Sequence, residues 1–255
     1  MTKCGELNLM RLKNGHIIGS RINIELRNFL YFVVLLSSGI PILSYFFAVR
    51  GGHLPAIMPF ISETPLFPPS TVIFPLGMTI ASIGMLLVAS VLRRRQAARI
   101  GVSGIRLVQV NNLAWYALIA AVISLIATAN MPWPRWPIIH TVAAGLFFML
   151  YLFWAALAVS VRWSTDSDAS SNSAVRIRIG AVGLGIFFYL AMVGLAFGSG
   201  QSHLFAPTKL SFDERSVLLH LAAACEWMLM LSFTVHTLAL AEEVRGRWSP
   251  ASLWS

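Results

Sequence analysis

The sequence predicts an all-α integral membrane protein: a bundle of six transmembrane helices with both termini in the cytosol. Hydrophobic residues make up 57% of the 255 positions, charged residues make up only 11%, and the mean hydropathy is +0.73. A soluble domain of this composition could not cover its apolar surface. Six apolar runs of about 20 residues, the length that crosses the hydrocarbon core of a bilayer, account for most of the chain.

The runs are separated by short polar or basic breaks, which set the boundaries of the spans. Each run is continuously apolar, as expected of a helix, whereas a transmembrane strand would alternate in polarity. The six predicted spans are 28–49, 73–92, 111–131, 138–161, 179–198 and 217–240. We therefore expect one membrane domain, 28–244, between a basic cytosolic tail, 1–27, and a short cytosolic tail, 245–255.

Lysine and arginine residues favour one side of the predicted bundle. If the N-terminus is cytosolic, the inside segments carry fifteen of the 19 basic residues and the outside segments carry four. The positive-inside rule then predicts that both termini are cytosolic. The net charge of +9 is explained by this topology and by contact with anionic lipid headgroups, so nucleic acid is not an expected partner.

Two further segments predict local structure. The stretch from 162 to 178, rich in serine and aspartate, has the composition of a solvated loop. In the fifth span, Gly194 and Gly198 form a GxxxG pattern, which predicts close approach of a neighbouring helix.

Four ionisable residues fall inside the predicted spans: His140, His220, Glu226 and His236. Glu226 lies about 14 Å along its helix from Val217, near the middle of the bilayer. A carboxyl group at that depth needs a cation or hydrogen-bond donors, or else takes up a proton and donates a hydrogen bond itself. His236, near the cytosolic end, is expected to be an interface residue.

A polar cluster is geometrically feasible at the outer end of the bundle. Asn130 and His140 flank the short connection between the third and fourth spans, His220 enters at a similar level, Glu226 lies beneath, and Glu63 lies above. One interpretation is a ligand or acid/base site with His140, His220 and Glu226 as candidate catalytic residues. The other is a set of interhelical hydrogen bonds that fix helix packing.

Several observations weaken the catalytic interpretation. His220 and Glu226 are six residues apart, which separates them by about 120° around a helix. The sequence contains no HExxH pairing, P-loop, dinucleotide-binding glycine run or GxSxG motif. We therefore assign no catalytic residue, expect no metal or cofactor, and favour a non-enzymatic protein.

The loop from 51 to 70 is the most polar connection on the outer side. Its five prolines restrict the backbone to turns and extended segments. We expect an ordered cap over the outer mouth of the bundle. Glu63 would accept hydrogen bonds from Ser62, Thr64 or nearby amides, or would face His140 and His220.

Four sequence motifs follow one another along the chain. The first is a Pro-aromatic-Ile-Ser-acidic-Thr motif after the first span, which consists of Pro59, Phe60, Ile61, Ser62, Glu63 and Thr64. Further along come "TAN" ending at Asn130, a histidine ten residues on at His140, and "HLAAACEW" with Glu226 and Trp227. Motifs in this order resemble those of the damage-regulated autophagy modulator (DRAM) proteins.

The resemblance covers about residues 28 to 245 and extends to the wider Frag/DRAM/Sfk group, which includes a factor that remodels the lipid of GPI anchors. It implies a multi-pass protein of the endomembrane system (lysosome or Golgi) or of the plasma membrane, connected with autophagy or membrane-lipid organisation. The implied partners are membrane lipids and other membrane proteins. The alternative that it leaves open is a lipid-remodelling enzyme or accessory factor.

Overall fold

The computed structural model describes residues 3–54, 59–100, 104–200 and 215–246, and within these ranges the side-chain environments from Leu26 to Val244. Six long α-helices and two short 3-10 helices fill these ranges. In chain order they are α1 (Lys3–Arg50), η1 (Ile61–Leu66), α2 (Ser70–Ile100), α3 (Ile105–Asn130), α4 (Pro137–Thr165), η2 (Ala169–Ser171), α5 (Ser173–Gly198) and α6 (Val217–Gly246).

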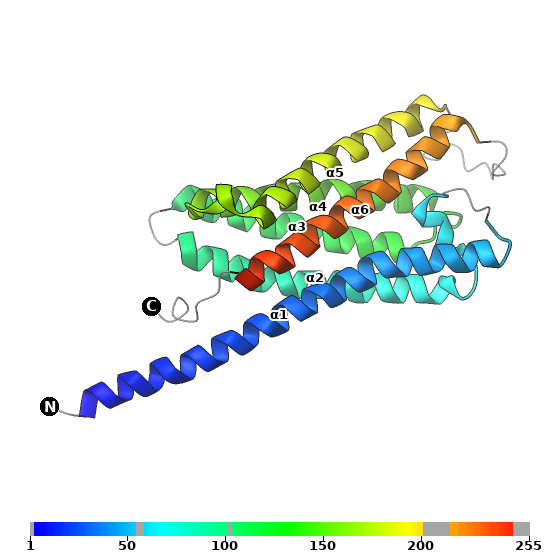
Figure 1. Ribbon diagram of the computed structural model, residues 1–255. Helices are drawn as coiled ribbons and strands as arrows, with labels where there is room; N and C mark the ends of the chain where they lie inside the picture. The colour runs from blue at the N-terminus through cyan, green and yellow to red at the C-terminus, as the bar shows by residue number, and fades with distance from the viewer. Residues whose placement is uncertain (1–2, 55–58, 101–103, 201–214, 247–255) are drawn as a thin grey trace.

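The six α-helices pack as a closed ring of antiparallel neighbours. Each helix contacts the next one along the chain, and α6 returns to contact α1. Helix α1 enters the bundle, and α6 leaves it, at the same end (Figure 1). We call this end, which holds the α2–α3 and α4–α5 connections, the terminal end. The opposite end, with η1 and the α3–α4 connection, is the loop end.

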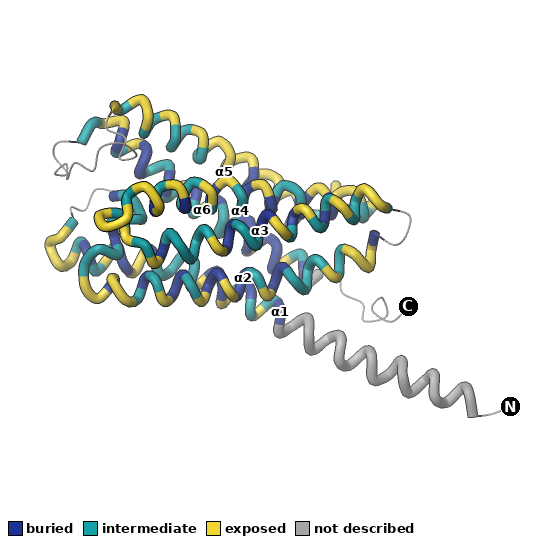
Figure 2. Tube along the Cα trace, turned by 180° about the vertical axis from the view of Figure 1, so that it is seen from behind, coloured by how far each residue is buried: buried dark blue, intermediate teal, exposed yellow. Residues whose placement is uncertain are grey.

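The core of the bundle is built from small and branched apolar side chains at the centre of the ring. Leu30 of α1, Val88 of α2 and Leu118 of α3 are at most 1% exposed. Large apolar side chains such as Leu35 and Leu190 are instead 68% and 63% exposed on the outer faces (Figure 2). Apolar residues outside as well as inside are expected of a bundle that lipid surrounds. All six α-helices are long and apolar enough, over their described residues, to cross a membrane.

The helices extend beyond the predicted spans, mainly at the terminal end. Helix α1 already begins at Lys3, within the segment expected to be a tail, and α2 continues to Ile100. The serine-rich connection after α4 is also more ordered than its composition predicts. The side chain of Asn172 caps α5 by accepting a hydrogen bond from the amide of Ala174 at 2.9 Å.

The glycines of α5 pack differently from the prediction. No heavy atom of the described residues lies within 4 Å of a Cβ built at Gly194 or Gly198, so the GxxxG pattern faces outward. The close approach occurs at Gly185 instead. A Cβ there would lie 2.6 Å from Leu152 of α4 and 2.9 Å from Ser232 of α6. Gly185 is therefore the residue that lets α5 approach both neighbours.

Replacing Gly185 by alanine should lower the thermal stability of the purified protein, because one methyl group overpacks a three-helix contact. The expected loss is about 1–3 kcal/mol. Gly194→Ala is the matched control, since its methyl group meets open space and alanine favours the helix. Equal melting temperatures for the two variants would contradict the assigned packing.

Candidate functional site: a capped loop end with a lateral groove

At the loop end, the connection between α1 and α2 contains a short helical turn, η1, held by its own polar side chains. The carboxylate of Glu63 accepts a hydrogen bond from the Phe60 amide at 3.0 Å, and the Thr64 hydroxyl donates to the Ile61 carbonyl at 2.8 Å. Thr64 is fully buried. The expected ordered cap is therefore present as η1, which contacts α1, α2 and α6.

Two consecutive residues of α6 hold η1 in place. The Ile61 amide donates to the Glu226 carboxylate at 2.7 Å, and the indole Nε1 of Trp227 donates to the Pro59 carbonyl at 2.8 Å. Glu226 lies about 14 Å along α6 from its start, so the turn reaches into the bundle. Non-helical backbone at membrane depth is stable only when protein groups satisfy it, and these two side chains do so.

Glu63 pairs with a residue that the sequence did not single out. Arg215, just before α6, donates from Nη1 and Nη2 to the two carboxylate oxygens of Glu63 at 2.9 and 2.5 Å. The side chains of Glu63 and Arg215 are 12% and 10% exposed. A bidentate pair is among the stronger charged contacts. Of the two expected arrangements for Glu63, the structure has the hydrogen bond from a nearby amide, that of Phe60, and not a pairing with His140 and His220; the guanidinium of Arg215 is an additional partner.

One ring nitrogen of His140 has a hydrogen-bond partner, and the other has none among the described residues. Nδ1 lies 2.8 Å from the Met131 carbonyl, so it must carry the proton, and Nε2 is then an acceptor. His140 is 5% exposed, and its Nε2 is buried with no hydrogen-bond partner among the described residues.

A lateral groove of about 460 Å³ runs between α4, α5 and α6 beneath η1. Ser62, Glu63, His140 and Glu226 line its polar part. The rest is apolar, and several of its lining residues, such as Met149 at 46% exposure, also face outward. The groove therefore opens sideways, toward lipid in a membrane.

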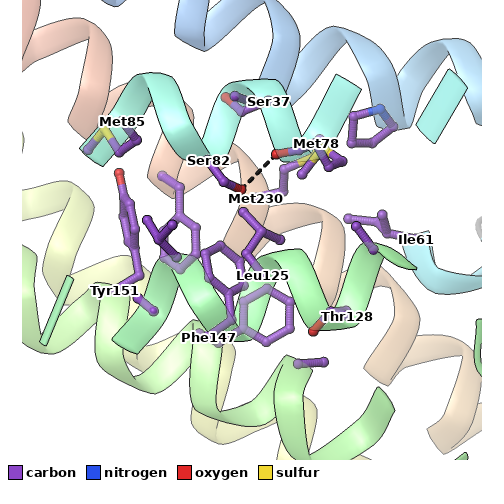
Figure 3. A pocket seen from close by; sticks show the side chains of 18 of the residues that line it. Ser37, Ile61, Met78, Ser82, Met85, Leu125, Thr128, Phe147, Tyr151 and Met230 are labelled. Carbon is purple, nitrogen blue, oxygen red and sulfur yellow. Dashed lines mark hydrogen bonds between the residues drawn. The ribbon is translucent and has the colours of Figure 1, made fainter. Parts of the chain in front are cut away.

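An inner cavity of about 120 Å³ lies within the bundle, lined by side chains of α1, η1, α2, α3, α4 and α6 (Figure 3). Met78, Leu125 and Phe147 give it a mainly apolar lining. Ser62, His140 and Glu226 line both the cavity and the groove. Together with Ala144 and Phe148, which also line both, these residues lie between the interior of the bundle and its lateral opening.

The structure brings together only part of the predicted cluster. Glu63, His140 and Glu226 share the groove. Asn130 points to α2, where its amide donates to Thr79 at 3.1 Å, and it lines a separate cavity that His140 also reaches. His220 is half-buried and lines neither the groove nor the two cavities. No three histidine, cysteine or acidic side chains are grouped as a metal site within the described residues.

His236 lies in the bundle rather than at its surface. It is 1% exposed and packs edge-on against Tyr151 and Trp154 of α4. Its depth follows from the extra turn of α6 beyond the predicted span, since the helix continues to Gly246.

The fold and the capped groove together define a polytopic membrane protein of six helices, with polar side chains gathered at one end of a lateral opening. Residues 26–244 match the family model described as the Frag1/DRAM/Sfk1/Cwh43P N-terminal domain, and the chain belongs to this family. The resemblance inferred from the outer-loop and α6 motifs is confirmed.

A human protein gives a second comparison. The chain is 25% identical over 228 residues to the DNA damage-regulated autophagy modulator protein 1 of Homo sapiens, an alignment that covers 84% of this chain and 88% of that protein. No solved structure is significantly similar to the chain.

The ion pair of Glu63 and Arg215 should be measurable as a coupling between the two positions. Glu63→Gln or Arg215→Met alone leaves one charge poorly paired, so each should lower the free energy of unfolding by up to about 3 kcal/mol. The double variant should lose less than the sum of the two. Thermal unfolding of the purified protein checks this, with Arg135→Met, an exposed arginine at the same end, as the control. Strict additivity would contradict the pairing.

Proposed function

We propose that this chain is a DRAM-like, non-catalytic modulator of autophagy or membrane-lipid organisation that acts by holding a lipid in the groove of α4, α5 and α6. The observation that carries the proposal is a groove open to the membrane, apolar along its length and polar beneath η1. A membrane lipid has the same division between its chain and its headgroup.

The size and chemistry of the groove fit such a ligand. Its volume of about 460 Å³ lies within the range of small-molecule sites, roughly 300–1,000 Å³. Apolar residues such as Met149 and Met192 would contact the acyl chain. At the polar end, Ser62, Glu63 and His140 line the groove and would face the headgroup.

The bonding of the acidic groups favours a binding role over catalysis. Glu226 accepts a hydrogen bond from the Ile61 amide, and Glu63 forms an ion pair with Arg215. Both carboxylates therefore stabilise the position of the cap. A general acid or base needs a reactive proton site directed at the substrate. The similarity to the human DNA damage-regulated autophagy modulator protein 1 supports the involvement in autophagy. We place the protein in the endomembrane system (lysosome or Golgi) or the plasma membrane.

Blocking the groove tests the proposal. Cells that lack the protein should show altered autophagic flux or lipid distribution, and the wild-type gene should restore it. Ala196→Trp, which fills the groove from α5, should retain less co-purified lipid and should fail to restore the cells.

Leu190→Trp is the matched control, because Leu190 lies on the same helix, is 63% exposed and does not line the groove. Its lipid content and rescue should equal those of the wild type. Unchanged flux, organelle morphology and lipid distribution in the deletion cells would count against the proposal.

A second candidate function is a lipid-remodelling enzyme or accessory factor. One observation favours it: the unpartnered Nε2 of His140 and the carboxyl group of Glu226 line the same groove. Glu226→Gln separates the two functions, because an amide oxygen still accepts the Ile61 hydrogen bond but cannot exchange a proton. If the protein acts as we propose, the Glu226→Gln variant should fully restore autophagic flux and lipid distribution in the deletion cells. A normal melting temperature together with an altered lipid profile would instead favour the enzyme.

A further inference from the structure

The terminal end of the bundle holds a second, strongly basic pocket, far from the groove. It is a cavity of about 50 Å³ between α2, α3, α4, α5 and α6. Five arginines line it, with one carboxylate, Glu243. The arginines are Arg93, Arg95, Arg99, Arg162 and Arg178. The lining thus has a large excess of positive charge in a confined space.

The single carboxylate is fully engaged by the two deepest arginines. Arg162 Nε donates to one oxygen of Glu243 at 2.5 Å, and Arg178 Nη1 pairs with the other. Arg162 also pairs with Asp166. Both guanidinium groups are only 2% exposed. Among the residues that line the pocket, arginines therefore far outnumber carboxylates.

Other contacts fix the walls of the pocket. Arg93 donates to Asn112 at 2.9 Å and lies over the Trp115 ring, 5.6 Å from its centroid. Gln96 donates to the Ala158 carbonyl at 3.3 Å. The charged groups are therefore held in place before any ligand arrives, which reduces the entropy lost on binding.

One buried donor has no hydrogen-bond partner there. Arg178 Nε is inaccessible and makes no hydrogen bond within the described part of the chain. A buried, unsatisfied donor on a charged group is costly and calls for an acceptor. An anion bound between Arg178 and the α2 arginines would offset the excess positive charge of the lining.

We propose that this pocket binds a phosphate group, specifically the dianionic phosphomonoester headgroup of a membrane lipid. Guanidinium groups match phosphate oxygens in geometry and charge. A volume of about 50 Å³ is more than one water requires and far less than a whole lipid, so it suits a small oxyanion. The pocket also lies just past the apolar span of α2, at the level where headgroups lie, on the side predicted to be cytosolic.

The proposal does not depend on the function assigned to the groove, which lies at the opposite end of the bundle. The same phosphate chemistry could come from a lipid or from free phosphate. Binding assays on the purified full chain distinguish these sources with three probes: short-chain phosphatidic acid, phosphatidylcholine of equal chain length, and inorganic phosphate.

The variant Arg95→Gln/Arg99→Gln removes two charges at the rim of the pocket. Arg95 is half-buried and Arg99 is exposed, and glutamine is a polar residue that favours the helix, so the fold should be retained. Phosphatidic acid should bind the wild type in preference to phosphatidylcholine and raise its melting temperature. The double variant should bind phosphatidic acid about tenfold more weakly.

Arg94→Gln is the matched control, since Arg94 belongs to the same helix but is exposed and does not line the pocket. It should bind phosphatidic acid as the wild type does. Competition by inorganic phosphate at similar concentration would support the phosphate site and assign it to a free anion instead of a lipid. Equal binding of phosphatidic acid to the wild type and the double variant, or equal affinity for phosphatidylcholine, would overturn the proposal.

Discussion

The hydrogen bond from the Ile61 amide to the Glu226 carboxylate holds η1 against α6, and the arrangement of the loop end depends on it. A backbone amide inside an apolar bundle needs an acceptor, and a carboxylate at that depth needs a donor. At 2.7 Å each satisfies the other. Trp227 also donates a hydrogen bond to the Pro59 carbonyl, and Arg215 pairs with Glu63. Together these contacts hold the loop over the polar end of the groove.

The two ends of the bundle use charged groups in opposite ways. At the loop end, the carboxylates are matched by an arginine and by backbone amides, and the open space is lined mainly by apolar side chains. At the terminal end, arginines outnumber carboxylates around a small cavity. A lipid spanning one leaflet has an apolar chain and a charged headgroup, so the first arrangement suits a chain and the second suits a phosphate. Both of our lipid-binding proposals rest on this contrast between the two ends.

Much of the fold could be predicted because it depends on local composition. Continuous apolar runs locate all six helices, and the proline-rich loop with Glu63 indicates a cap. The helix ends were less predictable, since polar ends such as that of α2 continue when neighbouring helices support them. Similarly, Gly185 and not the GxxxG pair packs closely, because the contact depends on the rotation of α5 against α4 and α6.

The sequence by itself determined the class of protein, its six spans, the family motifs and the need of Glu226 for a partner. These features depend on hydropathy, span length and residue identity, which are properties of contiguous stretches of the sequence. Only the tertiary structure decided that the partner is the Ile61 amide, that Arg215 pairs with Glu63, and that Asn130 turns toward Thr79. These contacts join residues 51 to 165 positions apart, and such pairs are set by how the helices rotate and where a loop folds back, which local patterns do not encode.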